Sequence, residues 1–274
     1  MLIYLKTSIE CACWMHRRRH QFQAGTNRKI PYSRYLWHIS LSGLVFFWSF
    51  YSLENSEWSW KLNTALPAAI LLRILYKGWI LKDPNDVEVQ ILSVSSSPSD
   101  LLFGPLQAAG SMIYLGLYHF CTIQSAVIAA ALVGDALAPL VGTRYGRHVY
   151  QLNPLARTKT MEGSIVVFLT TVFMSYVFLH AMDISPVEPL RMVLAYGAIA
   201  AVAEATAPSH LDNLVICMVL LASIPHVQTL LDDDAFGTVP VVVEQVAQRP
   251  ANVFVQVTNF VFYRNQNSTV KAGA

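Results

Sequence analysis

An aspartate lies inside a stretch of this chain that is otherwise apolar enough to be embedded in a membrane. Asp135 follows the run CTIQSAVIAAALVG, and the chain stays apolar after it as far as Gly142. A carboxylate inside a bilayer is costly unless it faces a partner or a polar cavity. Carboxylates are also the hard oxygen ligands that Mg²⁺ prefers, usually together with the phosphates of a substrate. Asp135 is therefore predicted to take part in a polar site.

Other ionisable side chains interrupt the apolar runs in the same way. Each has a structural alternative, because an arginine can extend to the membrane surface and an aspartate can cap a helix. Several such residues in one bundle favour a shared functional site, and two or three carboxylates there would suit Mg²⁺. The predicted metal ligands are Asp135, Glu204 and Asp212. The other ionisable residues are His38 and Arg73, and Asn213 is the polar neighbour of Asp212.

The loop that follows Asp135 is rich in glycine and in basic side chains. Its sequence, GTRYGRHVYQLNPLARTKTMEGS, ends at what reads as the start of a helix. Basic side chains neutralise phosphate, while glycines and helix N-termini let backbone amides approach it. The loop matches neither a Walker motif nor a dinucleotide fingerprint, but it still predicts a nucleotide site. The predicted nucleotide-binding residues are Gly134, Gly142, Arg144, Gly146, Arg147, Lys159, Gly163, Ser164 and Asn213.

The composition predicts the elements that must position these residues. Of the 274 residues, 54% are hydrophobic and only 13% are charged, which is far more apolar than an ordinary soluble domain. We therefore expect an all-α fold, a polytopic membrane bundle of about seven transmembrane helices. Because several of the apolar runs are short, the bundle should thin locally or enclose a polar cavity. The predicted spans are 37–53, 66–81, 105–120, 122–141, 163–182, 190–205 and 214–231.

The distribution of charge predicts the orientation of the bundle. Basic residues, including Arg17 to Arg19 and Arg34, dominate the segment before the first apolar run, so the N-terminus is expected in the cytosol. The loops 82–104, 142–162 and 206–213 then all face the cytosol, which favours one site on that side. We expect the endoplasmic reticulum membrane, with the site facing the cytosol. The basic start also resembles an organellar transit sequence, and the alternative is the plastid envelope.

Three regions are predicted along the chain. Residues 1–34 form a basic cytosolic tail, 35–231 a transmembrane domain, and 232–274 a C-terminal tail at the membrane interface. In the first tail, Cys11 and Cys13 with His16 and His20 weakly resemble a metal cluster. Because their spacing fits a tetrahedral site poorly, the favoured interpretation is a mobile tail that could be acylated.

Six segments together resemble a known family of integral membrane lipid kinases. The segments are SRYLWHISLSGLVFF, LLRILYKG, DLLFGPLQAA, GDALAPLVGTRYG, KTMEGS and EATAPSHLDNL. In order, spacing and membrane placement they resemble phytol kinase, dolichol kinase and CTP-dependent diacylglycerol kinase, and most of all the phytol and farnesol kinase branch. The resemblance runs from Ser33 to about Leu220. The chain departs from the family pattern at Ile70, Pro139 and Leu211.

The resemblance implies a function. A kinase of this family would transfer the γ-phosphate of CTP, or of UTP, with Mg²⁺ to an isoprenoid alcohol such as phytol, farnesol, geranylgeraniol or dolichol. Its partners would be the nucleotide, the lipid alcohol and the bilayer, and no nucleic acid. The alternatives are a phosphatidate cytidylyltransferase-like CTP enzyme, a diacylglycerol kinase, and a non-enzymatic transporter or scaffold. The implied catalytic residues are His38, Arg73, Asp135 and Glu204.

Overall fold

The computed structural model describes residues 32–52, 59–93, 97–186 and 189–235, together with Thr7, Glu10, Cys11 and Trp14. One compact unit, Met1–Asp232, carries nearly all of these residues, and the second unit is Asp233–Ala274. Most of the two predicted tails lies outside the described ranges. So do Cys13, His16 and His20, the other members of the weak cysteine and histidine cluster.

The described part of the first unit is all-α, as predicted, apart from one short strand pair. A 3-10 segment, Gly43–Phe47, connects the first two helices, and the third continues into a π-helical segment, Tyr76–Leu81. The helices are α3 (Tyr32–Ser42), α4 (Trp48–Ser52), α5 (Ala65–Leu75), α6 (Val87–Leu92), α7 (Gly104–Tyr118), α8 (Ile123–Tyr145), α9 (Met161–Ala181), α10 (Pro189–Thr206) and α11 (Asp212–Ala235).

Within the described ranges, five helical stretches are long and apolar enough to cross a membrane. They fit a polytopic membrane protein, and each of the seven predicted spans falls on a helical stretch. The two predicted spans outside the five are those on α3–α4 and on α10, so the count of seven remains a prediction. The five stretches are Lys61–Leu81, Pro98–Tyr118, Ile123–Tyr145, Met161–Ala181 and Asp212–Leu231.

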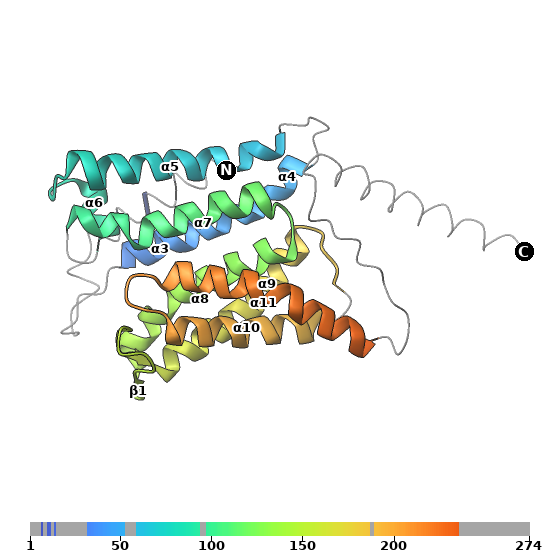
Figure 1. Ribbon diagram of the computed structural model, residues 1–274. Helices are drawn as coiled ribbons and strands as arrows, with labels where there is room; N and C mark the ends of the chain where they lie inside the picture. The colour runs from blue at the N-terminus through green and yellow to red at the C-terminus, as the bar shows by residue number, and fades with distance from the viewer. Residues whose placement is uncertain are drawn as a thin grey trace, which may run out of the picture. The chain divides into compact units, whose positions relative to one another are not determined.

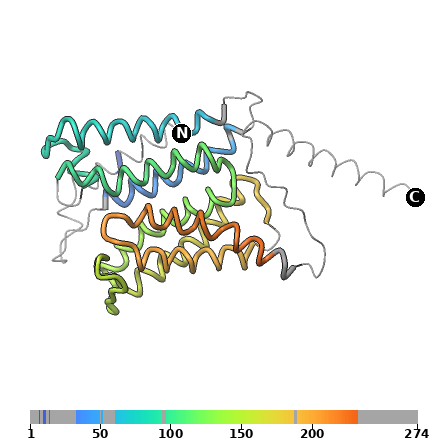
Figure 2. The backbone as a smooth tube through the Cα atoms, viewed as in Figure 1, coloured from blue at the N-terminus to red at the C-terminus, as the bar shows by residue number. Residues whose placement is uncertain are grey.

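The helices lie side by side with their long axes roughly parallel (Figure 1). Helix α8 is the centre of this bundle, because 61% of its most apolar stretch is buried inside the protein, more than in any other candidate span. The loop after α5, the loop between α8 and α9, and the turn between α10 and α11 lie at the same end (Figure 2). We call this the loop end. It gathers the three loops that the sequence predicted on one side of the membrane.

Glycines let α8 and α9 pack closely. A Cβ atom on Gly134 would lie 3.0 Å from the Val167 carbonyl oxygen and 3.2 Å from the Val167 Cα atom. A Cβ atom on Gly163 would lie 3.3 Å from the carbonyl oxygen of Ala138. Small residues at such positions are typical of helix pairs in membranes, where close backbone contact replaces the hydrophobic effect. Both glycines therefore have a packing role, whatever else they do.

Replacing Gly134 by alanine is expected to destabilise the protein by about 1–2 kcal/mol, since overpacking outweighs the gain in helix propensity. Thermal unfolding of the detergent-solubilised protein measures this change. Gly110→Ala in α7 is the matched control, because among the described residues a Cβ atom there would meet only Leu71 Cδ1, at 4.0 Å. The control should unfold at the wild-type temperature or slightly above it. Equal unfolding temperatures for the two variants would contradict the packing role of Gly134.

Candidate active site

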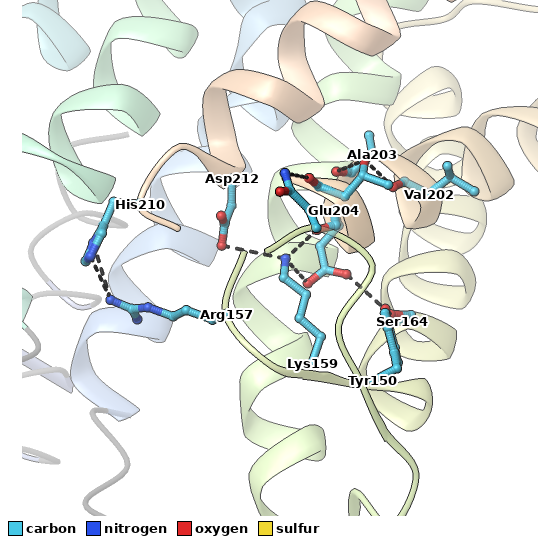
Figure 3. Close-up of polar contacts among 11 residues, drawn as sticks. Tyr150, Arg157, Lys159, Ser164, Val202, Ala203, Glu204, His210 and Asp212 are labelled. Atoms are coloured by element: carbon cyan, nitrogen blue, oxygen red, sulfur yellow. Dashed lines mark hydrogen bonds and ion pairs between the residues drawn. The ribbon is translucent and has the colours of Figure 1, made fainter. Parts of the chain in front are cut away.

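Three ionisable side chains, Lys159, Glu204 and Asp212, meet at the loop end (Figure 3). Lys159 Nζ lies 2.6 Å from Glu204 Oε1 and 3.8 Å from Asp212 Oδ2. Asp135, from α8, interacts electrostatically with all three of these residues. We call Asp135, Glu204, Asp212 and Lys159 the carboxylate cluster. It brings together the three metal ligands that were predicted and one of the predicted nucleotide-binding residues.

A small hairpin places Lys159 in the cluster. Strand β1 (Val149–Tyr150) pairs antiparallel with β2 (Lys159–Thr160), with Tyr150 opposite Lys159. The residue after Lys159, Thr160, is the N-cap of α9, and its side chain accepts a hydrogen bond from the Gly163 N–H at 3.2 Å. The hairpin and the cap thus fix the backbone on both sides of Lys159.

The Glu204 carboxylate is fully engaged within the cluster. Its Oε1 atom accepts from Lys159, and its Oε2 atom accepts from the Ser164 hydroxyl at 3.3 Å. Lys159 also donates to the backbone oxygen of Glu204, and the Tyr150 hydroxyl contacts that of Ser164. The Glu204 side chain is only 8% exposed. Glu204 is thus a buried acid whose charge is balanced by Lys159.

Lys159 keeps its charge although it is largely buried. Burial alone would lower its pKa, but the neighbouring carboxylates of Glu204 and Asp212 raise the pKa above the usual value of 10.5. The ammonium group is therefore protonated at neutral pH. It is held by two acids and lies within electrostatic range of a third, Asp135.

The oxygen atoms of the cluster are of the chemical type that a divalent cation prefers. Three carboxyl groups face one ammonium group, and Asp212 Oδ1 is buried without a hydrogen-bond partner. Asp135 makes no hydrogen bond or ion pair with any residue that the structure describes. Such a surplus of carboxylate oxygens suits Mg²⁺. Even so, no group of three or more acidic, histidine or cysteine side chains in the described ranges is close enough to hold a metal.

A guanidinium group lies beside the cluster. Arg34, at the start of α3, lies over Gly104, where a Cβ atom would collide with it, and interacts electrostatically with Asp135. Within the described ranges Arg34 makes no hydrogen bond or ion pair. The carbonyl oxygen of Gly104 accepts a hydrogen bond from the buried Asn213 side chain at 3.2 Å. The starts of α3, α7 and α11 therefore meet next to the cluster.

Three hydrogen bonds tie the loop between α8 and α9 to the turn between α10 and α11. We call these bonds the loop clamp, because they hold the two segments that carry Lys159 and Asp212 together. Their lengths are 3.1, 3.0 and 3.0 Å. They run from Asn153 Nδ2 to Thr206 O, from Ser209 N to Leu155 O, and from Arg157 Nη2 to His210 Nε2.

Arg73 lies in a different ion-pair network. Its side chain is 63% exposed and pairs with Glu88, with Nε 2.8 Å from Oε2. Lys77 joins the same network, since it lies 2.7 Å from Asp86 and 3.1 Å from Glu88. Among the described residues Arg73 makes no contact with the carboxylate cluster. The structure therefore does not bring this predicted catalytic residue to the other candidates.

His38 is not bonded to the acids of the cluster within the described ranges. It lies one turn after Arg34 in α3, and its buried Nε2 atom has no hydrogen-bond partner. Its ring meets the Trp37 ring edge-on, with 5.3 Å between centroids. Among the described residues it makes no hydrogen bond or ion pair with Asp135, Glu204 or Asp212.

The remaining nucleotide-binding candidates divide between packing and the surface. Gly142 and Gly146 both pack on Thr160. A Cβ atom added to either glycine would lie 2.6 Å from the Thr160 side chain. The side chains of Arg144, in the last turn of α8, and of Arg147, in the loop after it, are exposed. The Gly163 N–H is used by the α9 cap, so it does not point freely toward a phosphate.

Several residues of the site were not predicted as such. Glu162 accepts from the backbone N–H groups of Arg147 and His148, at 3.0 and 3.3 Å, and so folds the loop over the start of α9. The hydroxyl of Tyr150, in β1, contacts that of Ser164, in α9. The acid at 162 was visible in TKTMEGS, but nothing in the sequence indicated the strand pairing that places Tyr150.

Comparison with known proteins gives three similar kinases. The chain is 30% identical over 168 residues to "Probable phytol kinase 2, chloroplastic" of Oryza sativa subsp. japonica. The aligned region covers 60% of this chain and 51% of that protein. It is 29% identical over 167 residues to "Probable phytol kinase 1, chloroplastic" of Glycine max, covering 59% and 52%. It is 42% identical over 74 residues to "Phytol kinase" of Synechocystis sp., covering 25% and 30%.

These similarities cover parts of the proteins concerned. The chain spans about half the length of the two plant relatives that it matches. No family model matches the chain. No solved structure matches it either.

Proposed function

Since this chain is a homologue of the phytol kinases, as its motifs predicted, we propose that it is a membrane-embedded kinase for an isoprenoid alcohol. The donor would be a nucleoside triphosphate, CTP or UTP, and the acceptor an alcohol such as phytol, farnesol, geranylgeraniol or dolichol. The observation that carries this proposal is the carboxylate cluster. It lies beside a basic loop at one end of a bundle of apolar helices.

Asp135 and Asp212 would hold Mg²⁺, with Glu204 as the third acid. This assignment is supported by the free oxygens of the first two residues, because Asp212 Oδ1 has no partner and Asp135 makes no bond within the described ranges. When bound, the ion neutralises the charge of the β- and γ-phosphates. Phosphoryl transfer needs placement and charge neutralisation more than covalent help from the protein. The acids of the cluster fit that requirement.

Basic side chains around the cluster would bind the triphosphate. Lys159 and Arg34 lie beside the carboxylates, while the exposed Arg144 and Arg147 are placed to meet the outer part of the nucleotide. A guanidinium binds phosphate oxygens through two parallel N–H groups, which gives both charge and orientation. Of these four, Arg34 carries the strongest argument, because it interacts electrostatically with Asp135 and its charge is not already paired within the described ranges.

The lipid alcohol would enter between helices with its tail in the hydrocarbon. Its hydroxyl group would then reach the loop end, where the cluster lies. For the acceptor of the hydroxyl proton we favour Glu204 over His38, because Glu204 belongs to the cluster and His38 makes no described contact with it. A carboxylate within hydrogen-bond reach of the hydroxyl is the geometry that general base catalysis requires.

The names of the two plant relatives favour the plastid envelope as the membrane. Both are called chloroplastic, and this agrees with the transit-like basic start of the chain. Neither the chain nor these relatives support the endoplasmic reticulum, which was the first expectation from the sequence. In a plastid envelope the site would face whichever compartment supplies the nucleotide.

The proposal is tested with the full chain in lipid nanodiscs and CTP labelled at the γ-phosphate. A panel of phytol, farnesol, geranylgeraniol, dolichol and diacylglycerol is offered, and each lipid product is separated and counted. Label in an isoprenoid phosphate supports the proposal. Label released as pyrophosphate indicates a cytidylyltransferase, and label in phosphatidate alone indicates a diacylglycerol kinase. If CTP and UTP give no labelled lipid at all, the kinase proposal is wrong.

A further inference from the structure

The Lys159 ammonium group occupies the position that a bound cation would share between two acids. Its Nζ atom lies 2.6 Å from Glu204 Oε1 and 3.8 Å from Asp212 Oδ2. The Lys159 side chain is 11% exposed and that of Glu204 8%, so water hardly screens this contact. Figure 3 shows Lys159 pointing between the two carboxylates from the hairpin. A lysine of the protein itself thus bridges the predicted metal ligands.

An ammonium group and a divalent ion cannot share this position. Mg²⁺ binds its oxygen ligands at about 2.0–2.1 Å, so an ion on Glu204 and Asp212 would be in direct conflict with Nζ. Both species are positive, and the site is poorly screened, so their repulsion would be large. A metal at these acids therefore requires Lys159 to leave them.

We infer that Lys159 is an internal counter-ion, which holds the cation position of the cluster in the nucleotide-free protein and moves away when metal and nucleotide bind. This inference rests on the proposed function, because it takes the cluster to be the metal site. Lysine suits the role, since its flexible stem carries three rotatable donors. The triphosphate would receive the ammonium group that the metal displaces.

Binding of metal and of nucleotide is then coupled. A metal held by all three acids must displace Lys159 from Glu204 and Asp212 and leave it without an acidic partner, so metal alone binds weakly. Nucleotide supplies the partner, and each ligand strengthens the other by the same factor. The free oxygens of Asp135 and Asp212 are ready for the ion, whereas Glu204 is released only when Lys159 moves.

The test measures binding of Mn²⁺ alone, as the loss of the free Mn²⁺ signal in electron paramagnetic resonance, with no nucleotide present. Lys159→Met should bind Mn²⁺ about 10-fold or more tightly than the wild type, within the usual range of coupling energies. Lys159→Arg, which keeps the charge, should bind as weakly as the wild type. With a non-hydrolysable CTP analogue, the wild type should gain Mn²⁺ affinity, and Lys159→Met should gain less.

Lys77→Met is the matched control. Lys77 also bridges two acids, Asp86 and Glu88, but outside the carboxylate cluster. Its loss should leave Mn²⁺ binding unchanged. An equal gain in Mn²⁺ affinity in the Lys77 and Lys159 variants would mean that lost positive charge alone explains the effect, and it would overturn the inference. An unchanged Mn²⁺ affinity in Lys159→Met would overturn it as well.

The outcomes separate this inference from the proposed function. If Lys159→Met does not yield folded protein, the wild type and Lys159→Arg are compared with and without the CTP analogue, which still tests the coupling. Equal Mn²⁺ affinity with and without the analogue overturns the inference. A labelled isoprenoid phosphate without any Mn²⁺ coupling would retain the kinase and reject the counter-ion. Coupling without a labelled lipid would reject the proposed acceptor and retain the counter-ion.

Discussion

Asp135→Asn is expected to lower the rate of alcohol phosphorylation by at least about 100-fold while the protein stays folded. The substitution keeps the size and polarity of the side chain but removes a charge that no described residue pairs with. Loss of that charge weakens the proposed metal site, and with it the neutralisation of the phosphates. The rate of label transfer from γ-labelled nucleotide to the alcohol, measured at saturating alcohol, gives the effect directly.

Asp183→Asn is the matched control for this substitution. Asp183 is exposed just beyond the end of α9, outside the carboxylate cluster, so its loss should leave the rate unchanged. Thermal unfolding of both variants should match that of the wild type. Near-normal turnover of Asp135→Asn would remove the central acid of the proposed site and, with it, the mechanism described above.

Glu204→Gln should destabilise the protein strongly as well as inactivate it. The change leaves the buried Lys159 ammonium group without its nearest counter-charge, and breaking a buried ion pair in this way costs about 3 kcal/mol or more. For a domain of this size that corresponds to a fall in the apparent unfolding temperature of roughly 6–12 °C. Differential scanning fluorimetry in detergent measures the fall, and label transfer measures the activity.

A double variant separates the two effects of Glu204. In Lys159→Met with Glu204→Leu the charges are removed together, and an apolar pair of similar volume is often as stable as the ion pair it replaces. Its unfolding temperature should return close to that of the wild type, while its activity should stay absent. A double variant as unstable as Glu204→Gln would show that Lys159 and Glu204 do not act as a pair.

The sequence predicted the helices well because the membrane leaves few alternatives. Each predicted span falls on a helical stretch, since a long apolar run that must satisfy its own backbone hydrogen bonds forms a helix. The strand pair at Val149–Tyr150 and Lys159–Thr160 was not predicted. It is too short to show an alternating pattern, and it depends on pairing across an irregular loop.

The candidate site was predicted in part. Asp135 and Glu204 stood out because a charge within an apolar run is rare, and the structure brings them together. Arg73 stood out for the same reason, but its partner Glu88 lies 15 residues away on a segment that folds back, which hydropathy does not reveal. Gly134 and Gly163 were interpreted as phosphate-binding residues, although their contacts show a packing role that a single sequence cannot distinguish.

The loop clamp has a consequence for the evolution of the protein. Because Asn153, Leu155 and Arg157 are bonded to the turn that leads into α11, an insertion or deletion in either segment would break the match between them. Homologues that keep the clamp should therefore change the lengths of both segments together.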